Sequence, residues 1–172
     1  MNVVKATRQF EAWLARHTRI DQKDLRLKHT NMKADVFMFL RATYYRWAQI
    51  WPEVCPDLAK APNVLAVGDL HIANFGTWRD IEGRLIWGVN DFDEASWLPY
   101  TNDLVRLVAS ANVAIDADHM ALNRKDACAA VLDGYQKDSR RAAVPTFWPK
   151  NTPRCARWPG IACEIPRLFG TS

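Results

Sequence analysis

Two short segments of the chain carry the side-chain types that phosphoryl transfer requires. Residues 68–74 contain Asp69, His71 and Asn74, and a segment farther along contains Asp91. Phosphoryl transfer uses a carboxylate to orient or deprotonate the acceptor hydroxyl, and oxygen ligands to hold the Mg²⁺ that neutralises the phosphates. We assign Asp69 as the catalytic base and count His71 as a second catalytic residue. Asn74 and Asp91 are assigned as the metal ligands.

The elements around these residues are expected to bring them to one place. An apolar run at 63–67 predicts a buried strand, which residues 68–74 follow as a loop. Segments 74–78 and 84–89 flank a Gly-containing, acidic turn at 80–83, so a β-hairpin is predicted. The second strand of this hairpin runs directly into Asp91. The acidic groups are therefore expected to gather where two strands end.

Helical periodicity accounts for most of the remaining chain. The apolar spacing predicts four helices. They cover about Lys5–His17, the stripe from Phe37 to Trp51 that Pro52 stops, a segment from Asn102 with Thr101 or Asn102 as N-cap, and a segment from Asn123 to about Arg140. The predicted fold class is α+β and mainly helical, with a β-hairpin carrying the site. Trp47, Trp51, Trp87 and Trp97 are interpreted as core residues, in preference to a platform for stacking bases.

Composition limits the class of protein. The chain has 172 residues, 49% of them hydrophobic, which is enough for one sizeable core. No apolar run approaches the roughly 20 residues of a membrane helix, and the first 19 residues mix charges into their apolar positions, unlike a signal peptide. The four cysteines form no C-x-x-C pair, which argues against a zinc site and a disulfide framework. We expect a cytoplasmic protein with no membrane partner and no nucleic-acid partner.

Nucleic-acid binding is disfavoured because the formal charge of +4 is not spread along the chain. Residues 141–172 hold five basic residues and one acidic residue, so this tail carries the whole excess. The same tail holds five of the nine prolines and shows neither helical nor strand periodicity. We therefore divide the chain into a domain at 1–140 and an irregular basic tail rich in Pro, Trp and Cys at 141–172.

The order Asp, four residues, Asn and then a later Asp is that of kinases. The sequence most resembles the aminoglycoside and choline phosphotransferase branch, whose loop commonly reads His-Gly-Asp-Leu-His-x-x-Asn and whose metal segment commonly reads Ile-Asp-Trp-Glu-Asp-Ala. The matching stretches here are 68–74 and 89–95, with Val67 in place of the first histidine. This resemblance implies ATP and Mg²⁺ as cofactors, a small-molecule hydroxyl as acceptor, and the catalytic lobe of a kinase-like fold. It also implies that Asp103 hydrogen-bonds back to the loop.

A more specific resemblance covers about residues 32–135. The bacterial family known as domain of unknown function 2252 shows a Phe-x-Phe-x-Arg helix, Gly-Asp-x-His-x-x-Asn-Phe-Gly, Asn-Asp-Phe-Asp-Glu and Asp-Leu-x-Arg-Leu. This chain supplies all four motifs in that order, at 37–41, 68–76, 90–94 and 103–107. We assign Arg41, Asp93, Asp103 and Arg106 to cofactor binding. For Arg41 the alternative is a surface or salt-bridging helix residue, and for Arg106 it is simple pairing with a carboxylate.

The kinase resemblance leaves one half of the site unaccounted for. A kinase needs a glycine-rich strand pair over the phosphates and a strand Lys, yet no glycine precedes Gly68. Because the family is longer than this chain, we expect the nucleotide-gripping lobe to follow the catalytic half, so that the chain as given is incomplete and binds ATP weakly or not at all. Residues 142–171, back-translated with chosen codons and read in a shifted frame, resemble the family's continuation. We interpret the tail as a frameshift product beginning near Arg140.

Two other functions remain open from the sequence. A non-catalytic nucleotide-binding or interaction remnant would keep the loop without its chemistry. A binuclear metallophosphoesterase would use Asp69 and His71 as metal ligands, but the second Gly-Asp and the Gly-Asn-His of that class are missing. In the simplest structural interpretation, Asp69 caps a backbone amide and His71 is a satisfied core residue.

Overall fold

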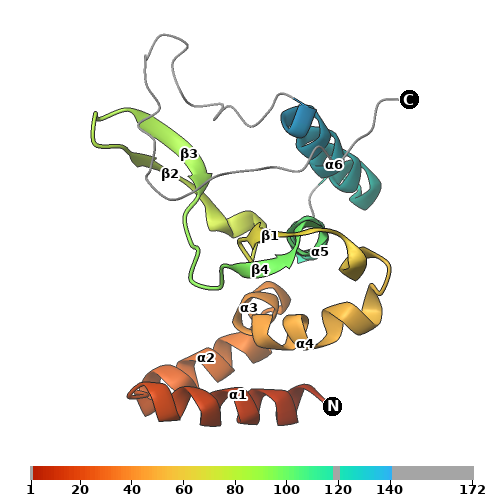
Figure 1. Ribbon diagram of the computed structural model, residues 1–172. Helices are drawn as coiled ribbons and strands as arrows, with labels where there is room; N and C mark the ends of the chain where they lie inside the picture. Colours follow the sequence, from red (N-terminus) through yellow and green to blue (C-terminus); the bar gives the residue numbers. More distant parts are fainter. Residues whose placement is uncertain (1, 118–120, 141–172) are drawn as a thin grey trace.

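The computed structural model describes residues 2–117 and 121–140, shown in Figure 1. This part of the chain forms six α-helices and two small antiparallel sheets of two strands each, which confirms the mainly helical α+β class. The division at residue 140 and the interpretation of the tail fall on 141–172, outside the described residues. In chain order the elements are α1 Val3–His17, α2 Gln22–Ala34, α3 Val36–Ala42, α4 Tyr44–Val54, the short 3₁₀ turn η1 Leu58–Lys60, β1 Asn63–Ala66, the turn η2 Ile72–Asn74, β2 Phe75–Arg79, β3 Leu85–Val89, β4 Ser96–Pro99, α5 Tyr100–Ala117 and α6 Arg124–Arg140.

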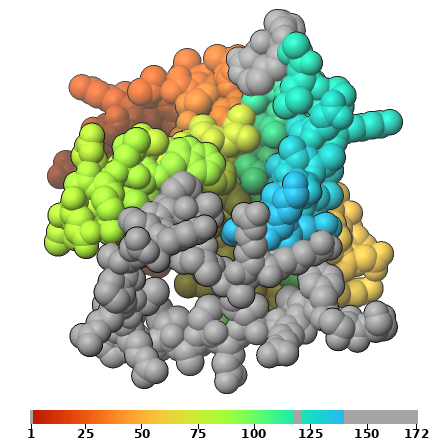
Figure 2. Space-filling view, turned by 90° about the horizontal axis from the view of Figure 1, so that it is seen from above, coloured from red at the N-terminus to blue at the C-terminus, as the bar shows by residue number. Residues whose placement is uncertain are grey.

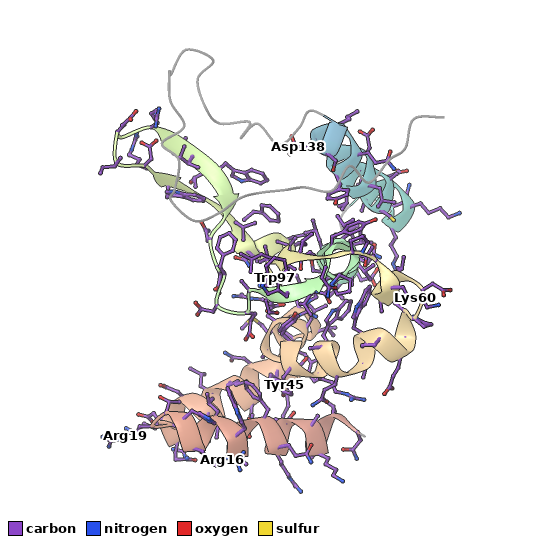
Figure 3. All side chains as sticks on the ribbon, in the orientation of Figure 1. Arg16, Arg19, Tyr45, Lys60, Trp97 and Asp138 are labelled. Atoms are coloured by element: carbon purple, nitrogen blue, oxygen red, sulfur yellow. The ribbon has the colours of Figure 1, made fainter. Side chains whose placement is uncertain are left out.

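The first four helices form a layer beneath the sheets (Figure 1). α1 packs on α4 through Phe10 and Tyr45, whose ring centroids are 4.3 Å apart, and the Tyr45 hydroxyl lies 2.7 Å from the Thr7 hydroxyl. Figure 3 shows Tyr45 between α4 and α1. α2, which the apolar periodicity did not predict, packs against α3. The predicted helix at 5–17 is confirmed as α1.

The continuous apolar stripe from Phe37 to Trp51 is divided between two helices. α3 ends at Ala42, and the hydroxyl of the following residue, Thr43, donates to the Phe39 carbonyl at 2.8 Å; α4 begins at Tyr44. The sequence predicted that Pro52 stops this helix, but α4 continues to Val54 with Pro52 in its last turn. The Cys55 amide still donates to the Trp51 carbonyl at 2.9 Å. Pro52 has no N–H to donate to the Ala48 carbonyl, so α4 lacks that one hydrogen bond.

The strands arrange the two segments that carry chemistry. β1 pairs with β4, so that Leu65 faces Trp97, and β2 pairs with β3 as the predicted hairpin. The hairpin turn is held by the Asp80 carboxylate, which accepts hydrogen bonds from the Glu82 and Arg84 amides at 2.9 Å. Figures 1 and 2 show the hairpin and α6 on opposite sides of the molecule. β4 was not predicted, since it has only four residues and ends in proline.

α5 and α6 complete the fold. α5 starts at Tyr100, so Thr101 and Asn102 lie inside its first turn and do not cap it as predicted. The Thr101 hydroxyl instead donates to the Leu58 carbonyl at 2.7 Å. The Asn123 side chain accepts from the Asp126 amide at 2.8 Å, which confirms it as the cap of α6. None of the helices described is long and apolar enough to cross a bilayer.

The tryptophans do not all belong to the core. Trp51 is buried and Trp47 is partly buried, and the two rings stack on each other. Trp87 and Trp97 are 49% and 72% exposed, so the prediction that they are core residues is wrong. Both lie on two-stranded sheets, and the directly paired position of Trp97 is the equally exposed Leu65.

Candidate functional site

One face of α5 holds the backbone of the loop at 67–72. The Asp103 carboxylate accepts hydrogen bonds from the Val67 amide at 2.7 Å and from the Gly68 amide at 3.0 Å, as the sequence resemblance implied. Two helical turns later, the Ser110 hydroxyl accepts from the Ile72 amide at 3.0 Å. These side chains lie on one helix face because their spacing is close to whole turns. α5 therefore acts as a rigid template for the loop.

Gly68 lies where the loop comes close to Glu94 in residues 90–94, which we call the acidic segment. Its φ is +85°, a left-handed conformation that side-chain-bearing residues rarely adopt. A Cβ atom at this position would lie 2.4 Å from the Glu94 carbonyl oxygen and 3.0 Å from the Tyr44 hydroxyl. Only glycine lets the two backbones approach this closely. The Gly-Asp pair thus brings the loop and the acidic segment into contact.

Asp69 is held by a buried arginine. Arg106 is 2% exposed, and its Nε and Nη2 atoms both donate to Asp69 Oδ1, at 2.9 and 2.5 Å. Nη2 also donates to the Leu40 carbonyl at 2.7 Å. The guanidinium lies over the rings of Tyr44 and Trp47, 5.6 and 5.0 Å from their centroids. The geometry favours the carboxylate-pairing interpretation of Arg106 over contact with a cofactor.

The arginine leaves one oxygen of Asp69 available. Oδ1 receives both guanidinium bonds, whereas Oδ2 makes no hydrogen bond with a described residue and lies 4.0 Å from His71 Nε2. The Asp69 side chain is 18% exposed. A carboxylate fixed through one oxygen presents the other in a defined direction, which suits it to orient a hydroxyl group.

Asn74 ties the loop to the end of β3. Its amide nitrogen donates to the Asp69 carbonyl at 3.3 Å and to the Asp91 carbonyl at 3.0 Å, and its Oδ1 accepts from the Asp91 amide at 2.8 Å. The Asn90 amide also donates to the Asn74 carbonyl at 2.9 Å. Asn74 is 5% exposed. This one side chain fixes two carboxylate-bearing residues, 22 positions apart in sequence, in register with each other.

Negative charge converges on the acidic segment. Burial, followed by the charges of Asp69, Asp91 and Asp93, raises the pKa of Glu94 above its ordinary value. Burial also raises the pKa of Asp103, although its bonds from the loop amides oppose that effect. Asp91 Oδ1 accepts from the Asp93 amide at 3.0 Å, so the segment folds back on itself. The site thus concentrates acidic side chains near Asp69.

The donor set fits a metal ion that arrives with phosphates better than one caged by protein alone. Within 2–117 and 121–140, no group of three or more His, Cys, Asp or Glu side chains is arranged to hold a metal. Mg²⁺ usually binds one or two carboxylates and completes its shell with waters and substrate phosphates. The predicted ligand Asn74 already accepts one hydrogen bond at Oδ1, which leaves that oxygen a second lone pair. Asp91 and Asn74 are therefore compatible with Mg²⁺ ligation.

Arg41 and His71 lie near Asp69, where α3 meets the loop. His71 is 5% exposed and its Nδ1 atom is buried without a hydrogen-bond partner among the described residues. Burial lowers the His71 pKa, the charge of Asp69 opposes this, and the charge of Arg41 adds to the lowering. The Phe37 ring meets the imidazole edge-on at 5.9 Å. Arg41 is exposed in the last turn of α3 and forms no ion pair with any described carboxylate.

The structure thus brings seven of the eight assigned residues into one connected arrangement and adds others. Hydrogen bonds link Asn74 to Asp69, His71 and Asp91, Asp91 to Asp93, and Asp69 to Arg106, while Asp103 bonds the Gly68 amide beside Asp69. Arg41 is a neighbour without such bonds. Sequence reasoning missed Asn102 and Ser110. Asn102 is 1% exposed, accepts from Trp47 Nε1 at 2.9 Å and donates to the Gly68 carbonyl at 3.4 Å. The spacing of four residues between Asn102, Arg106 and Ser110 was the available signal.

Comparison with known protein families gives one match. The family described as "uncharacterized protein conserved in bacteria" (DUF2252) matches residues 19–146, a wider range than the motifs alone indicated and most of the chain. Neither the curated proteins nor the solved structures gave a significant match. The matched range contains the loop, the hairpin, the acidic segment and α5. The chain belongs to the DUF2252 family.

Proposed function

We propose that this domain carries the catalytic half of a kinase-like site that transfers a phosphoryl group from ATP to the hydroxyl of a small molecule. The observation that carries the proposal is the Asn74 side chain, which bonds the backbone of both Asp69 and Asp91. Phosphoryl transfer depends mainly on positioning and on electrostatic stabilisation. A link that fixes an orienting carboxylate relative to a metal-binding carboxylate supplies such positioning.

Each residue has a role under this proposal. Asp69, held through Oδ1 by Arg106, orients the acceptor hydroxyl with Oδ2 and accepts its proton. Asp91 and Asn74 would hold Mg²⁺, which neutralises the phosphate charge when it is bound. Asp103 keeps the loop in place, and Asp93 and Glu94 add negative potential that attracts the cation. The positions of these side chains and the charges that face them support these roles.

The alternatives fit less of the geometry. In a metallophosphoesterase Asp69 and His71 would share a metal, but Arg106 already neutralises Asp69. A nucleotide-binding remnant without catalysis has one observation in its favour, because no glycine-rich loop precedes Gly68. Such a remnant would retain Mg²⁺-dependent nucleotide binding and lack turnover. A turnover measurement therefore separates it from the proposal.

We expect slow, Mg²⁺-dependent consumption of ATP by the purified protein. Asp69→Ala removes the orienting carboxylate and Asp91→Ala removes a metal ligand, so each is expected to lower the rate by about 100-fold or more. The rate is measured as ADP released. Asp57→Ala serves as the matched control, since Asp57 is a 91% exposed carboxylate paired only with Lys60 at the surface. If the rate of ATP consumption is unchanged in both site variants, the turnover does not come from this site. If the protein binds ATP without turnover, the non-catalytic nucleotide-binding remnant is the correct description.

A further inference from the structure

The surroundings of Asp69 are electrostatically asymmetric. Asp91, Asp93 and Glu94 lie on the side of the hairpin, and this side suits a metal ion. On the side of α3 lie Arg41 and His71, neither of which makes a side-chain hydrogen bond with a described residue. A buried ring nitrogen left without a partner costs free energy unless something bonds to it. The Arg41 guanidinium and His71 Nδ1 are thus uncommitted, and the other ring nitrogen, Nε2, lies 4.0 Å from the free oxygen of Asp69.

The contacts of α3 place Arg41 close to His71 and Asp69. Phe37 touches the His71 ring, and Arg41 follows Phe37 by four residues, so both lie on the same helix face. Helical side chains lean toward the N-terminus of their helix, which directs Arg41 back over the turn that contains Phe37. The carbonyl of Leu40 accepts from Arg106, which itself holds Asp69. The last turn of α3 is therefore anchored within the site.

We propose that Arg41 and His71 form a binding site for an anionic group of the phosphate acceptor, such as a carboxylate or a phosphate ester. This inference rests on the proposed function, because the acceptor hydroxyl must lie at Asp69 Oδ2. An arginine binds carboxylates and phosphates through charge-assisted hydrogen bonds, and the imidazole adds a donor that the protein itself leaves unpaired. The acceptor is thus a small hydroxyl compound that carries its own negative charge.

The test titrates the intact protein with inorganic phosphate, in the absence of metal and nucleotide, and follows the imidazole resonances of His71 by NMR. In the parent protein these resonances are expected to shift saturably. Arg41→Gln is expected to weaken the binding at least about tenfold, the loss of roughly one charge-assisted hydrogen bond. Arg41 is exposed, so this substitution leaves the fold intact.

Arg16→Gln is the matched control. Arg16, like Arg41, is an exposed arginine in the last turn of its helix, and Figure 3 shows it near the far end of α1, away from the sheets. It is expected to leave the titration unchanged. The proposal is overturned if the His71 resonances show no saturable shift, or if Arg41→Gln and the parent bind phosphate equally. Because the titration contains neither ATP nor Mg²⁺, its failure would leave the ATP-consumption test standing.

Discussion

Arg106→Met is expected to lower the free energy of unfolding by roughly 3–5 kcal/mol, which is what breaking a buried ion pair from one side typically costs. Methionine keeps most of the side-chain volume but leaves Asp69 as an unpaired carboxylate that is only 18% exposed. It also removes the donor to the Leu40 carbonyl, which joins α5 to α3. Urea unfolding followed by circular dichroism measures the change.

Two further variants keep the Arg106 prediction testable if the methionine variant fails to fold. Arg106→Lys retains the charge but cannot make both guanidinium bonds to Oδ1, and is expected to lose less stability than Arg106→Met. In the double variant Arg106→Met, Asp69→Asn the stranded charge is gone, so part of the lost stability is expected to return. Arg124→Met is the control, since the Arg124–Asp116 pair is more than half exposed and should leave the midpoint nearly unchanged. Equal midpoints for Arg106→Met and the parent would refute the structural role of this pair.

Gly68→Ala is expected to cost roughly 2–5 kcal/mol of unfolding free energy. The left-handed backbone penalises any side chain by about 1–2 kcal/mol, and forcing a Cβ against the Glu94 carbonyl adds an overpacking cost of about 1–3 kcal/mol. Because the clash lies between the loop and the acidic segment, it should also displace Asp69 from Asp91. The change is measured by urea unfolding.

The chain offers an internal comparison for this substitution. Gly83 in the hairpin turn has φ +76°, and nothing lies within 4 Å of the position its Cβ would occupy. Gly83→Ala therefore carries the conformational penalty alone, about 1–2 kcal/mol. If the two alanine variants lose the same stability, the close approach at Gly68 contributes nothing.

Features encoded by neighbouring residues could be predicted from the sequence. The hairpin was predicted from its turn residues, and its strands end within one residue of the expected positions. α1 and α6 were predicted because each carries a cap or an apolar stripe of its own. The strand before Gly68 was predicted from a short apolar run. In each case the signal lies inside the element.

Features that depend on tertiary contacts could not be predicted in this way. α2 has no apolar stripe of the usual width and no buried residue, and it is stabilised by its packing on α3. The break at Thr43 interrupts a periodic stripe that looks continuous in the sequence. β4 exists because β1 supplies its hydrogen-bond partners. The exposure of Trp97 follows from the same two-stranded pairing.

The candidate site shows the same division. The loop and the acidic segment were singled out in the sequence by the residue types that phosphoryl transfer would need. The partner of Arg106 was not predicted, since Asp69 lies 37 positions away and the nearest acidic residue in sequence, Asp103, is occupied by loop amides. The bridging role of Asn74 was also hidden, because the same residue type serves as a metal ligand. Only the folded chain shows which backbone groups its amide reaches.

Paramagnetic Mn²⁺ in place of Mg²⁺ probes whether Asn74 holds Asp69 and Asp91 in one site for a metal ion and a nucleotide, as we propose. We predict that Mn²⁺ with ATP, added together, binds weakly and broadens the backbone amide resonances of Asn74 and Asp91, whereas Mn²⁺ alone does not, because the protein supplies too few ligands without phosphates. Asp91→Ala should abolish the broadening and Asp57→Ala should not. Broadening that needs no nucleotide, that centres on other residues, or that persists in Asp91→Ala would contradict the account.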